Sequence, residues 1–235
     1  MDTGDDLKAL LDRAGQLVRA GDIVEAEKAF RGALDLAERA YGRDAPQVIA
    51  PLRGLAYIAA NPRSDPGRLV EADAWIRRAL RVAEANFGTD DPRLSRLLHS
   101  LGINLWTAGA LEEASEHLVR AVALSERAHG ESRDTAYIMT SLIYVLLEAE
   151  RPADALPLAE RALRIQEAAA DSTSGSAVTL ALIALGRCLM GVKRNTEAIA
   201  CMEQAAARIL ARNPDARSPA LGEIRGWIEQ MRREP

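Results

Sequence analysis

A pattern of small and large side chains recurs five times along this chain of 235 residues. Each copy has an alanine, then a residue of variable size four positions later, then a second alanine three positions after that. The first alanines lie roughly 41 to 46 residues apart, so the pattern spans nearly the whole chain. Repetition at such a period predicts an array of similar units, each packed against its neighbours, in place of one central core. The copies are Ala26/Phe30/Ala33, Ala72/Ile76/Ala79, Ala114/Leu118/Ala121, Ala155/Ala159/Ala162 and Ala198/Met202/Ala205.

A second pattern precedes each copy and predicts an amphipathic helix. Its residues follow the spacing i, i+3, i+4, i+7, which places them on one face of a helix. A small residue in the middle of this face, such as Gly102 or Gly186, lets the following helix approach closely. Each unit is therefore predicted to be two antiparallel helices, A then B, joined by a short turn such as Ala108-Gly109. We assign the extra residues of the longest spacing to a loop at 61–67. The pattern comprises Leu10/Ala14/Leu17, Leu52/Leu55/Ala56/Ala59, Leu98/Leu101/Gly102/Leu105, Met139/Leu142/Ile143/Leu146 and Leu182/Leu185/Gly186/Leu189.

Glycine, proline and aspartate mark the boundaries between units. Glycine can adopt the left-handed conformation that closes a helix. An aspartate followed by proline predicts an acidic N-cap and a proline in the first turn of the next helix. Asp44-Ala45-Pro46 and Asp90-Asp91-Pro92 have this form, and residues 171–175 are expected to cap the fifth unit. The glycines that end the first three units are Gly42, Gly88 and Gly130.

These features resemble the tetratricopeptide repeat (TPR), in the long form of about 42 residues found in kinesin light chains. The resemblance rests on Tyr41-Gly42-Arg43-Asp44-Ala45-Pro46, on Phe87-Gly88-Thr89-Asp90-Asp91-Pro92 and on residues 155–163. It implies an all-α fold, a right-handed α-solenoid of five helix-turn-helix repeats with a C-terminal capping helix. We expect the repeats within residues 1–213, at approximately 5–42, 44–88, 90–130, 132–171 and 174–212. The capping helix would lie in 214–235, where Leu221, Ile224, Ile228 and Met231 share one face.

Composition and charge exclude several classes of protein. Hydrophobic residues make up 48% and charged residues 27% of the chain, as in a soluble globular protein. The net charge of −4 provides no cationic field for nucleic acid or anionic lipid. Two cysteines, Cys188 and Cys201, suit a reducing cytosol and make no disulfide framework. The N-terminus is acidic, unlike a signal peptide, and the most apolar stretch is too short to span a bilayer. We expect a cytoplasmic protein with no nucleic-acid and no membrane partner.

The A helices of TPR arrays line a concave surface, and the resemblance implies a binding groove there. The residues expected to face this groove include no Asp or Glu. This bias predicts a cationic, partly aromatic groove for a peptide or protein segment of acidic character. A lower acid content on crowded A helices is the alternative explanation. The predicted groove residues are Arg53, Tyr57, Arg96, His99, Ile103, Trp106, Tyr137, Thr140, Tyr144 and Arg187.

The groove departs from two known TPR patterns. The carboxylate clamp of chaperone-binding TPR domains needs paired cations and asparagines four residues apart, whereas Tyr57 follows Arg53 and Ser100 follows Arg96. The paired asparagines usual in kinesin light chains are also replaced. Neither chaperone tails nor kinesin cargo are therefore predicted as partners. The replacements are Arg53-Gly54, His99-Ser100 and Thr140-Ser141.

No residue pattern for catalysis is found. The three histidines, His99, His117 and His129, have no second ligand at metal-binding spacing, and no glycine pattern fits a phosphate loop. We therefore predict a non-catalytic adaptor or scaffold that uses no cofactor and no metal. Two alternatives stay open. One is a self-associating module, in which the array, or the face that bears Trp75 and Phe87, forms a homodimer or organises a larger complex. The other is a sensor of a small peptide or metabolite.

Overall fold

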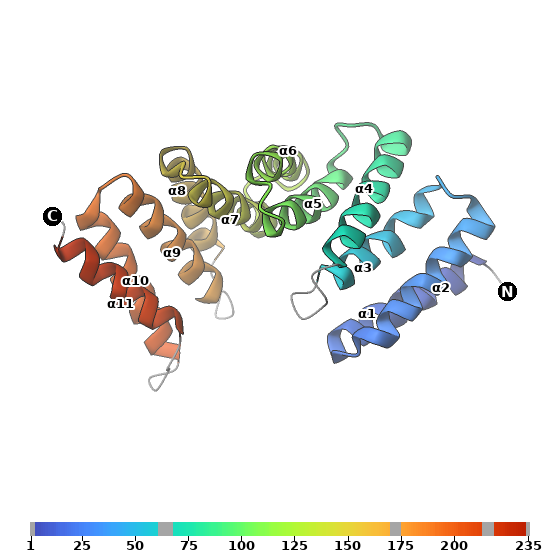
Figure 1. The fold of residues 1–235 in the computed structure, drawn as a ribbon, viewed down its shortest axis with the longest axis horizontal. Coiled ribbons are helices and arrows are strands. Elements are labelled where there is room, and N and C mark those ends of the chain that lie inside the picture. Colours follow the sequence, from blue (N-terminus) through green and yellow to red (C-terminus); the bar gives the residue numbers. More distant parts are fainter. Residues whose placement is uncertain (1–2, 61–67, 170–174, 213–218, 234–235) are drawn as a thin grey trace. The chain divides into compact units, whose positions relative to one another are not determined.

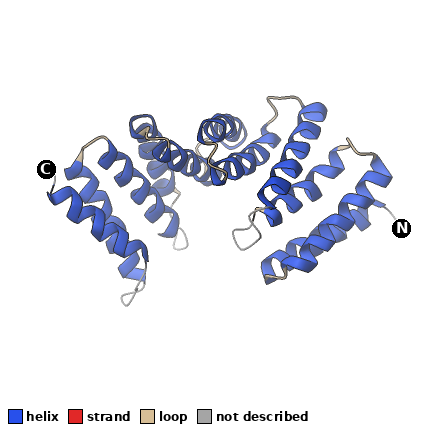
Figure 2. Ribbon diagram, viewed as in Figure 1, coloured by secondary structure: helices blue, strands red, loops and turns tan. Residues whose placement is uncertain are grey.

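The computed structural model describes residues 3–60, 68–169, 175–212 and 219–233. All regular secondary structure within these ranges is helical, which confirms the all-α prediction (Figure 2). The contacts divide the chain into two compact units, Met1–Leu124 and Ser125–Pro235, so the boundary falls inside one helix. The loop predicted at 61–67 and residues 171–174 of the predicted fifth cap lie outside the described residues.

The first unit is built from helices that pack in consecutive antiparallel pairs, α1 with α2 and α3 with α4 (Figure 1). Short 3-10 turns precede the third and fifth α-helices. A third pair begins with α5 and the start of α6, in which the unit ends. The elements are α1 (Thr3–Ala20), α2 (Ile23–Tyr41), η1 (Pro46–Val48), α3 (Ile49–Ala59), α4 (Arg68–Phe87), η2 (Pro92–Leu94), α5 (Ser95–Thr107) and α6 (Leu111–His129).

The second unit continues the same scheme. Helix α7 packs against α8, α9 packs against α10, and a last helix, α11, packs against α10. We call α1, α3, α5, α7 and α9 the A helices and α2, α4, α6, α8 and α10 the B helices. The elements are α7 (Arg133–Glu148), α8 (Pro152–Ala168), α9 (Gly175–Gly191), α10 (Asn195–Arg212) and α11 (Pro219–Arg233).

The two recurring patterns form most of the buried interior of the hairpins, although Leu10 and Leu17 on α1 are only half-buried. The alanines of all five B-helix copies are buried, as are Ile76, Leu118 and Met202 between them. In the first copy, Phe30 is only half-buried. The four apolar residues predicted on α11, which are Leu221, Ile224, Ile228 and Met231, are buried as well.

Glycine permits the close approach of A and B helices that the sequence predicts. A Cβ on Gly102 would lie 2.6 Å from Cγ of Leu118, and a Cβ on Gly186 would lie 2.8 Å from Cε of Met202. At Gly102 a Cβ would also lie 3.3 Å from the carbonyl oxygen of Ala114, so the close contact with the paired B helix requires glycine there. At Gly186 the nearest atom is the end of the flexible Met202 side chain, which can move to make room for a small residue.

The helix ends confirm most of the predicted boundary signals and correct one. Gly42, Gly88 and Gly130 all have positive φ, at 95°, 88° and 60°. Asp91 is the N-cap of η2, and its side chain accepts a hydrogen bond from the Arg93 backbone. The prediction that Asp44 caps the third helix is wrong, because Ala45 occupies the N-cap of η1 and makes no side-chain cap. The Asp44 carbonyl instead accepts a hydrogen bond from Asn86 Nδ2 at 2.9 Å.

Candidate functional site

Ion pairs join neighbouring B helices at equivalent positions of successive hairpins. In the first set, an arginine of the later helix contacts a glutamate of the earlier helix. A second set links the same helices within the first unit. The first set is Arg78–Glu38 at 2.6 Å, Arg120–Glu84 at 2.8 Å and Arg161–Glu126 at 2.6 Å. The second set is Arg31–Glu71 at 2.9 Å and Arg77–Glu113 at 2.7 Å. We call these contacts the B-helix ion pairs.

The A helices of the first unit present a different charge environment around Arg53. This exposed arginine of α3 makes no hydrogen bond or ion pair with any residue that the structure describes. Desolvation by the surrounding protein, and then the positive charge of Arg96 on α5, lower the pKa of the Arg53 guanidinium. Two arginines of neighbouring A helices therefore lie close enough to repel each other, and Arg53 has no carboxylate among the described residues to balance its charge.

The other predicted residues of the first unit lie on the same two helices. Tyr57 of α3 keeps 64% of its surface exposed. On α5, His99, Ile103 and Trp106 are half-buried. Burial lowers the pKa of His99 to about 4, so its imidazole is neutral at pH 7. The structure thus places the six predicted residues of this unit on α3 and α5, with Arg53 and Arg96 as neighbours.

In the second unit, the predicted residues lie on α7 and α9. Tyr137 is 64% exposed, whereas Thr140 is half-buried and donates its hydroxyl to the Ala136 carbonyl at 2.9 Å. The guanidinium of Arg187 lies 5.3 Å from the ring centre of Tyr144. This arginine, which the sequence predicts to face an acidic partner, already contacts an aromatic ring in a cation–π geometry.

Trp227, which the sequence patterns did not single out, also contacts Arg187. Its ring centre on α11 is 5.7 Å from the Arg187 guanidinium. Trp227 flanks the apolar face of α11 and is half-buried. The amphipathic pattern of the tail predicted a helix that packs on the preceding repeat, but it gave no partner for the tryptophan. The position of Trp227 beside Ile224 and Ile228, on the packed face of the helix, is the sequence signal that indicates a contact with the preceding repeat.

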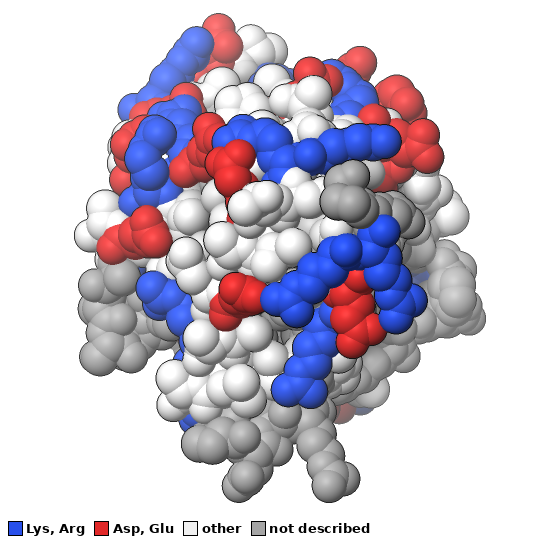
Figure 3. Space-filling model, turned by 90° about the vertical axis from the view of Figure 1, so that its left-hand side faces the viewer, with Lys and Arg blue, Asp and Glu red and all other residues white. Residues whose placement is uncertain are grey.

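Charge elsewhere on the surface is mixed. On the face drawn in Figure 3, Lys and Arg side chains lie among Asp and Glu side chains, with uncharged atoms between them. Both signs in close proximity match the small net charge of −4. Arg53 differs from the charged residues of this mixed face because it has no carboxylate partner among the described residues.

Metal-binding clusters and membrane-spanning helices are both absent from the part of the chain that the structure describes. Within the described ranges, no three His, Cys, Asp or Glu side chains gather as a metal ion would require. Across those same ranges, the helices are all too short or too polar to span a bilayer.

The hairpins are similar to those of known proteins. Residues 67–127 match the family model described as tetratricopeptide repeat. The solved structure of BtubC (BKLC) from P. vanneervenii is 20% identical, with a TM-score of 0.78 over 92% of this chain and 85% of that one. This chain has the TPR fold.

Two further TPR structures are similar to it. A putative kinesin light chain from Podosopora anserina, with nearly identical TPR-like repeats, has a TM-score of 0.74 at 18% identity, over 93% of this chain and 100% of that one. YrrB, described as a TPR protein with an unusual peptide-binding site, has a TM-score of 0.56 at 17% identity, over 88% and 86% of the two chains. No match was found among curated protein sequences. The TPR fold, in the form seen in kinesin-light-chain-like repeats, is thus the prediction that the comparisons confirm.

Proposed function

We propose that this chain is a non-catalytic interaction module that binds an acidic peptide or protein segment on the A-helix surface of its first unit. The unpaired charge of Arg53 among the described residues is the observation that carries this proposal. The arginines of the B-helix ion pairs all have a carboxylate within 3 Å, whereas Arg53 has the repulsive charge of Arg96 beside it. A bound carboxylate would replace this repulsion with attraction, and arginine binds carboxylates well through its planar, two-pronged guanidinium.

The neighbouring side chains supply apolar contact area. Tyr57 lies one helical turn from Arg53, so the two share a face of α3. Its exposed ring can cover an apolar group of the partner while Arg53 meets a carboxylate. Tyrosine, tryptophan and arginine are the residues most enriched at the energetic centres of protein interfaces. The pairing of Arg53 with Tyr57 therefore suits a partner segment that carries acidic and apolar residues side by side.

His99 contributes to this surface as a neutral group. Because burial keeps its pKa near 4, it offers one donor and one acceptor at neutral pH and adds no charge. Binding should therefore depend on the arginines and show little change between about pH 6 and pH 8.

The second unit adds its own candidate contacts, Tyr137, Thr140 and Tyr144. Arg187 is a weaker anchor for an anion there, because two aromatic rings already lie beside its guanidinium. YrrB, whose fold is similar, is a TPR protein with an unusual peptide-binding site. We assign the acid-binding role to Arg53 and Arg96 of the first unit; Tyr137 and Tyr144 are candidate apolar contacts of the second unit by itself.

A selection from random peptides tests the proposal. A phage-displayed library of 12-residue peptides is selected on the intact chain, and the enriched peptides are measured by fluorescence anisotropy. We expect enrichment of Asp and Glu over the starting library and dissociation constants of about 1–10 μM. The double variant Arg53→Glu/Arg96→Glu should weaken these peptides at least about tenfold.

The matched control is Arg208→Glu/Arg225→Glu, which makes the same change in net charge at two exposed positions of α10 and α11. We expect this control to bind within about twofold of the original chain. Circular dichroism verifies that both double variants stay helical. Selected peptides without acidic enrichment, or equal binding by the two double variants, contradict the proposal.

A further inference from the structure

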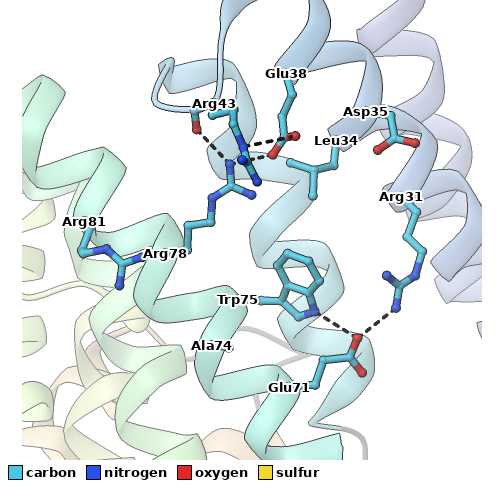
Figure 4. Close-up of a pocket in the computed structure, with 10 residues that line it drawn as sticks. All are labelled: Arg31, Leu34, Asp35, Glu38, Arg43, Glu71, Ala74, Trp75, Arg78 and Arg81. Atoms are coloured by element: carbon cyan, nitrogen blue, oxygen red, sulfur yellow. Dashed lines mark hydrogen bonds and ion pairs between the residues drawn. The ribbon is translucent and has the colours of Figure 1, made fainter.

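A pocket of about 610 Å³ lies between α2 and α4, and none of its lining residues belongs to an A helix (Figure 4). Its volume falls in the range of about 300–1,000 Å³ found for ligand sites. The walls combine an indole, two small apolar side chains and charged groups of both signs. The lining residues are Arg31, Leu34, Asp35, Glu38, Arg43, Glu71, Ala74, Trp75, Arg78 and Arg81.

Trp75 occupies the middle of this pocket between two B-helix ion pairs. Its indole nitrogen donates a hydrogen bond to Oε1 of Glu71 at 3.3 Å. The guanidinium of Arg31 lies 6.0 Å from the centre of the ring. Figure 4 shows the ring pointing from α4 toward Leu34 of α2. These contacts hold the indole in one orientation, and because the residue is only half-buried, part of the ring lines the open pocket.

The next junction, between α4 and α6, provides an internal comparison. There His117 takes the place of Trp75, between the ion pairs that Arg77 and Arg120 make. The imidazole lies 3.6 Å from Glu113, just as the indole meets the glutamate four residues earlier in its own helix. The same frame of ion pairs therefore holds a small polar ring at one junction and a large apolar ring at the other. Of these two junctions, the one between α2 and α4 offers an indole surface and the one between α4 and α6 does not.

The charges at one end of the pocket are not balanced. Arg81 makes no hydrogen bond or ion pair with any residue in the described ranges. Arg43 keeps 79% of its side chain exposed, and its Nε is 3.9 Å from Oε2 of Glu38. Arg81 lies six residues after Trp75, a distance of about 9 Å along the helix axis. The pocket thus offers an aromatic surface and, farther along α4, positive charge that can accept an anion.

We propose that this pocket binds an extended peptide segment that carries an aromatic side chain and, about three residues away, a carboxylate. The aromatic ring packs on Trp75 and Leu34, and the carboxylate contacts Arg81 and Arg43. An extended chain advances about 3.3 Å per residue, so three residues span about the same length as the rise from Trp75 to Arg81 along the α4 axis. Aromatic pairs gain energy beyond the area that they bury, and tryptophan and arginine are enriched among the residues that contribute most at protein interfaces. This site is independent of the proposed function at Arg53 and Arg96.

A defined peptide tests this proposal on the full chain. The probe is a fluorescein-labelled, amidated peptide with the sequence Ser-Gly-Phe-Gly-Ser-Glu-Glu-Gly-Ser, measured by anisotropy. We expect saturable binding with a dissociation constant at or below about 100 μM. Trp75→Ala and Arg81→Glu should each weaken binding by about tenfold or more. A second peptide, with glutamine in place of both glutamates, should bind the original chain weakly. Its affinity for the Arg81→Glu variant should be the same as for the original chain.

Two control variants show whether the effect is local. His117→Ala removes the ring at the equivalent place of the next junction, and Arg208→Glu makes the same charge change at an exposed position of α10, in the second unit. Both should bind the probe as the original chain does. The variant Arg53→Glu/Arg96→Glu should also bind the probe with the affinity of the original chain. This result would separate the pocket from the A-helix surface.

Three results overturn the proposal. The first is no saturable binding up to about 1 mM peptide. The second is unchanged binding by Trp75→Ala and Arg81→Glu, with circular dichroism showing that both are folded. The third is self-association of the original chain, measured by sedimentation, that Trp75→Ala abolishes, because a second copy of this chain would then occupy the pocket.

Discussion

One nitrogen atom of Arg120, on α6, contacts both Glu84 of α4 and the loop that follows α4. Its Nη2 lies 2.8 Å from Oε1 of Glu84 and donates a hydrogen bond to the Thr89 carbonyl at 2.6 Å. Arg78 makes the equivalent contacts one hairpin earlier, with Glu38 and with the Arg43 carbonyl. Each of these two arginines thus connects its own helix to the preceding B helix and to the loop that follows that helix. These contacts repeat with the fold because each hairpin brings the same two positions together.

Loss of this contact should lower stability measurably. The two side chains are only 34% and 27% exposed, so water screens the pair incompletely. We expect Arg120→Met to reduce the free energy of unfolding by about 1 kcal/mol, measured by urea denaturation. Arg208→Met, at an exposed position of α10 without such a partner among the described residues, is the control and should change stability little. Equal free energies of unfolding for the two variants would show that the Arg120–Glu84 pair contributes nothing to stability.

Two glycines in helices should respond in opposite directions to alanine. Gly102→Ala places a Cβ 2.6 Å from Leu118, so the helices must separate, and we expect a loss of about 1–3 kcal/mol. A Cβ added at Gly32 of α2 would meet no neighbouring atom within 4 Å, and Gly32→Ala should raise the free energy of unfolding by about 0.5–1 kcal/mol. Thermal and urea denaturation of the two variants measure both changes. The same sign for both would contradict the close packing of α5 against α6.

His99 should make the fold less stable in mild acid. Burial lowers its pKa from 6.5 to about 4 in the folded chain, while the unfolded chain keeps the ordinary value. Between these two values the unfolded chain binds a proton that the folded chain does not, so the free energy of unfolding falls as the pH falls. The loss should be on the order of 2 kcal/mol between about pH 7.5 and pH 4.5. In His99→Gln this part of the pH dependence should disappear, and identical pH profiles would contradict the assignment.

The two cysteines should differ in reactivity. Cys188 is fully buried, and burial raises its pKa to about 12. Cys201 is half-buried, and its pKa is raised by burial and then by Glu197. Because the thiolate is the reactive form, we expect iodoacetamide at about pH 8 to label Cys201 slowly in the folded chain and Cys188 only after unfolding. Mass spectrometry of Cys201→Ser and Cys188→Ala separates the two rates, and rapid labelling of Cys188 in the folded chain would contradict its burial.

Local patterns in the sequence were enough to predict the helices and their packed faces. Apolar spacing identified the alanines of the B helices, and Gly102 and Gly186 were correctly expected to permit close approach. The N-cap at Asp44 was wrong by one residue, because Pro46 begins a 3-10 turn that Ala45 precedes. Such a difference depends on backbone geometry that the residue types alone do not determine.

Side-chain contacts between distant residues could not be predicted in the same way. The contact of Trp227 with Arg187 and the pocket at Trp75 both join helices whose relative rotation the sequence leaves undetermined. The B-helix ion pairs are an exception, because both partners recur at fixed positions of the repeat. Arg78, Arg120 and Arg161 share one position of the repeat, and their glutamate partners share another, so aligning the repeats would have shown the pairs.

The repeated arginine–glutamate contact gives three successive joints, α2–α4, α4–α6 and α6–α8, the same chemistry. The α8–α10 joint differs, because Gln204 occupies the position of the arginine. A gene segment that encodes the hairpin of α4 or of α6 carries an arginine for the preceding joint and a glutamate for the following one. Duplication or deletion of either segment in register would therefore leave each of these three joints with the same pair of residues.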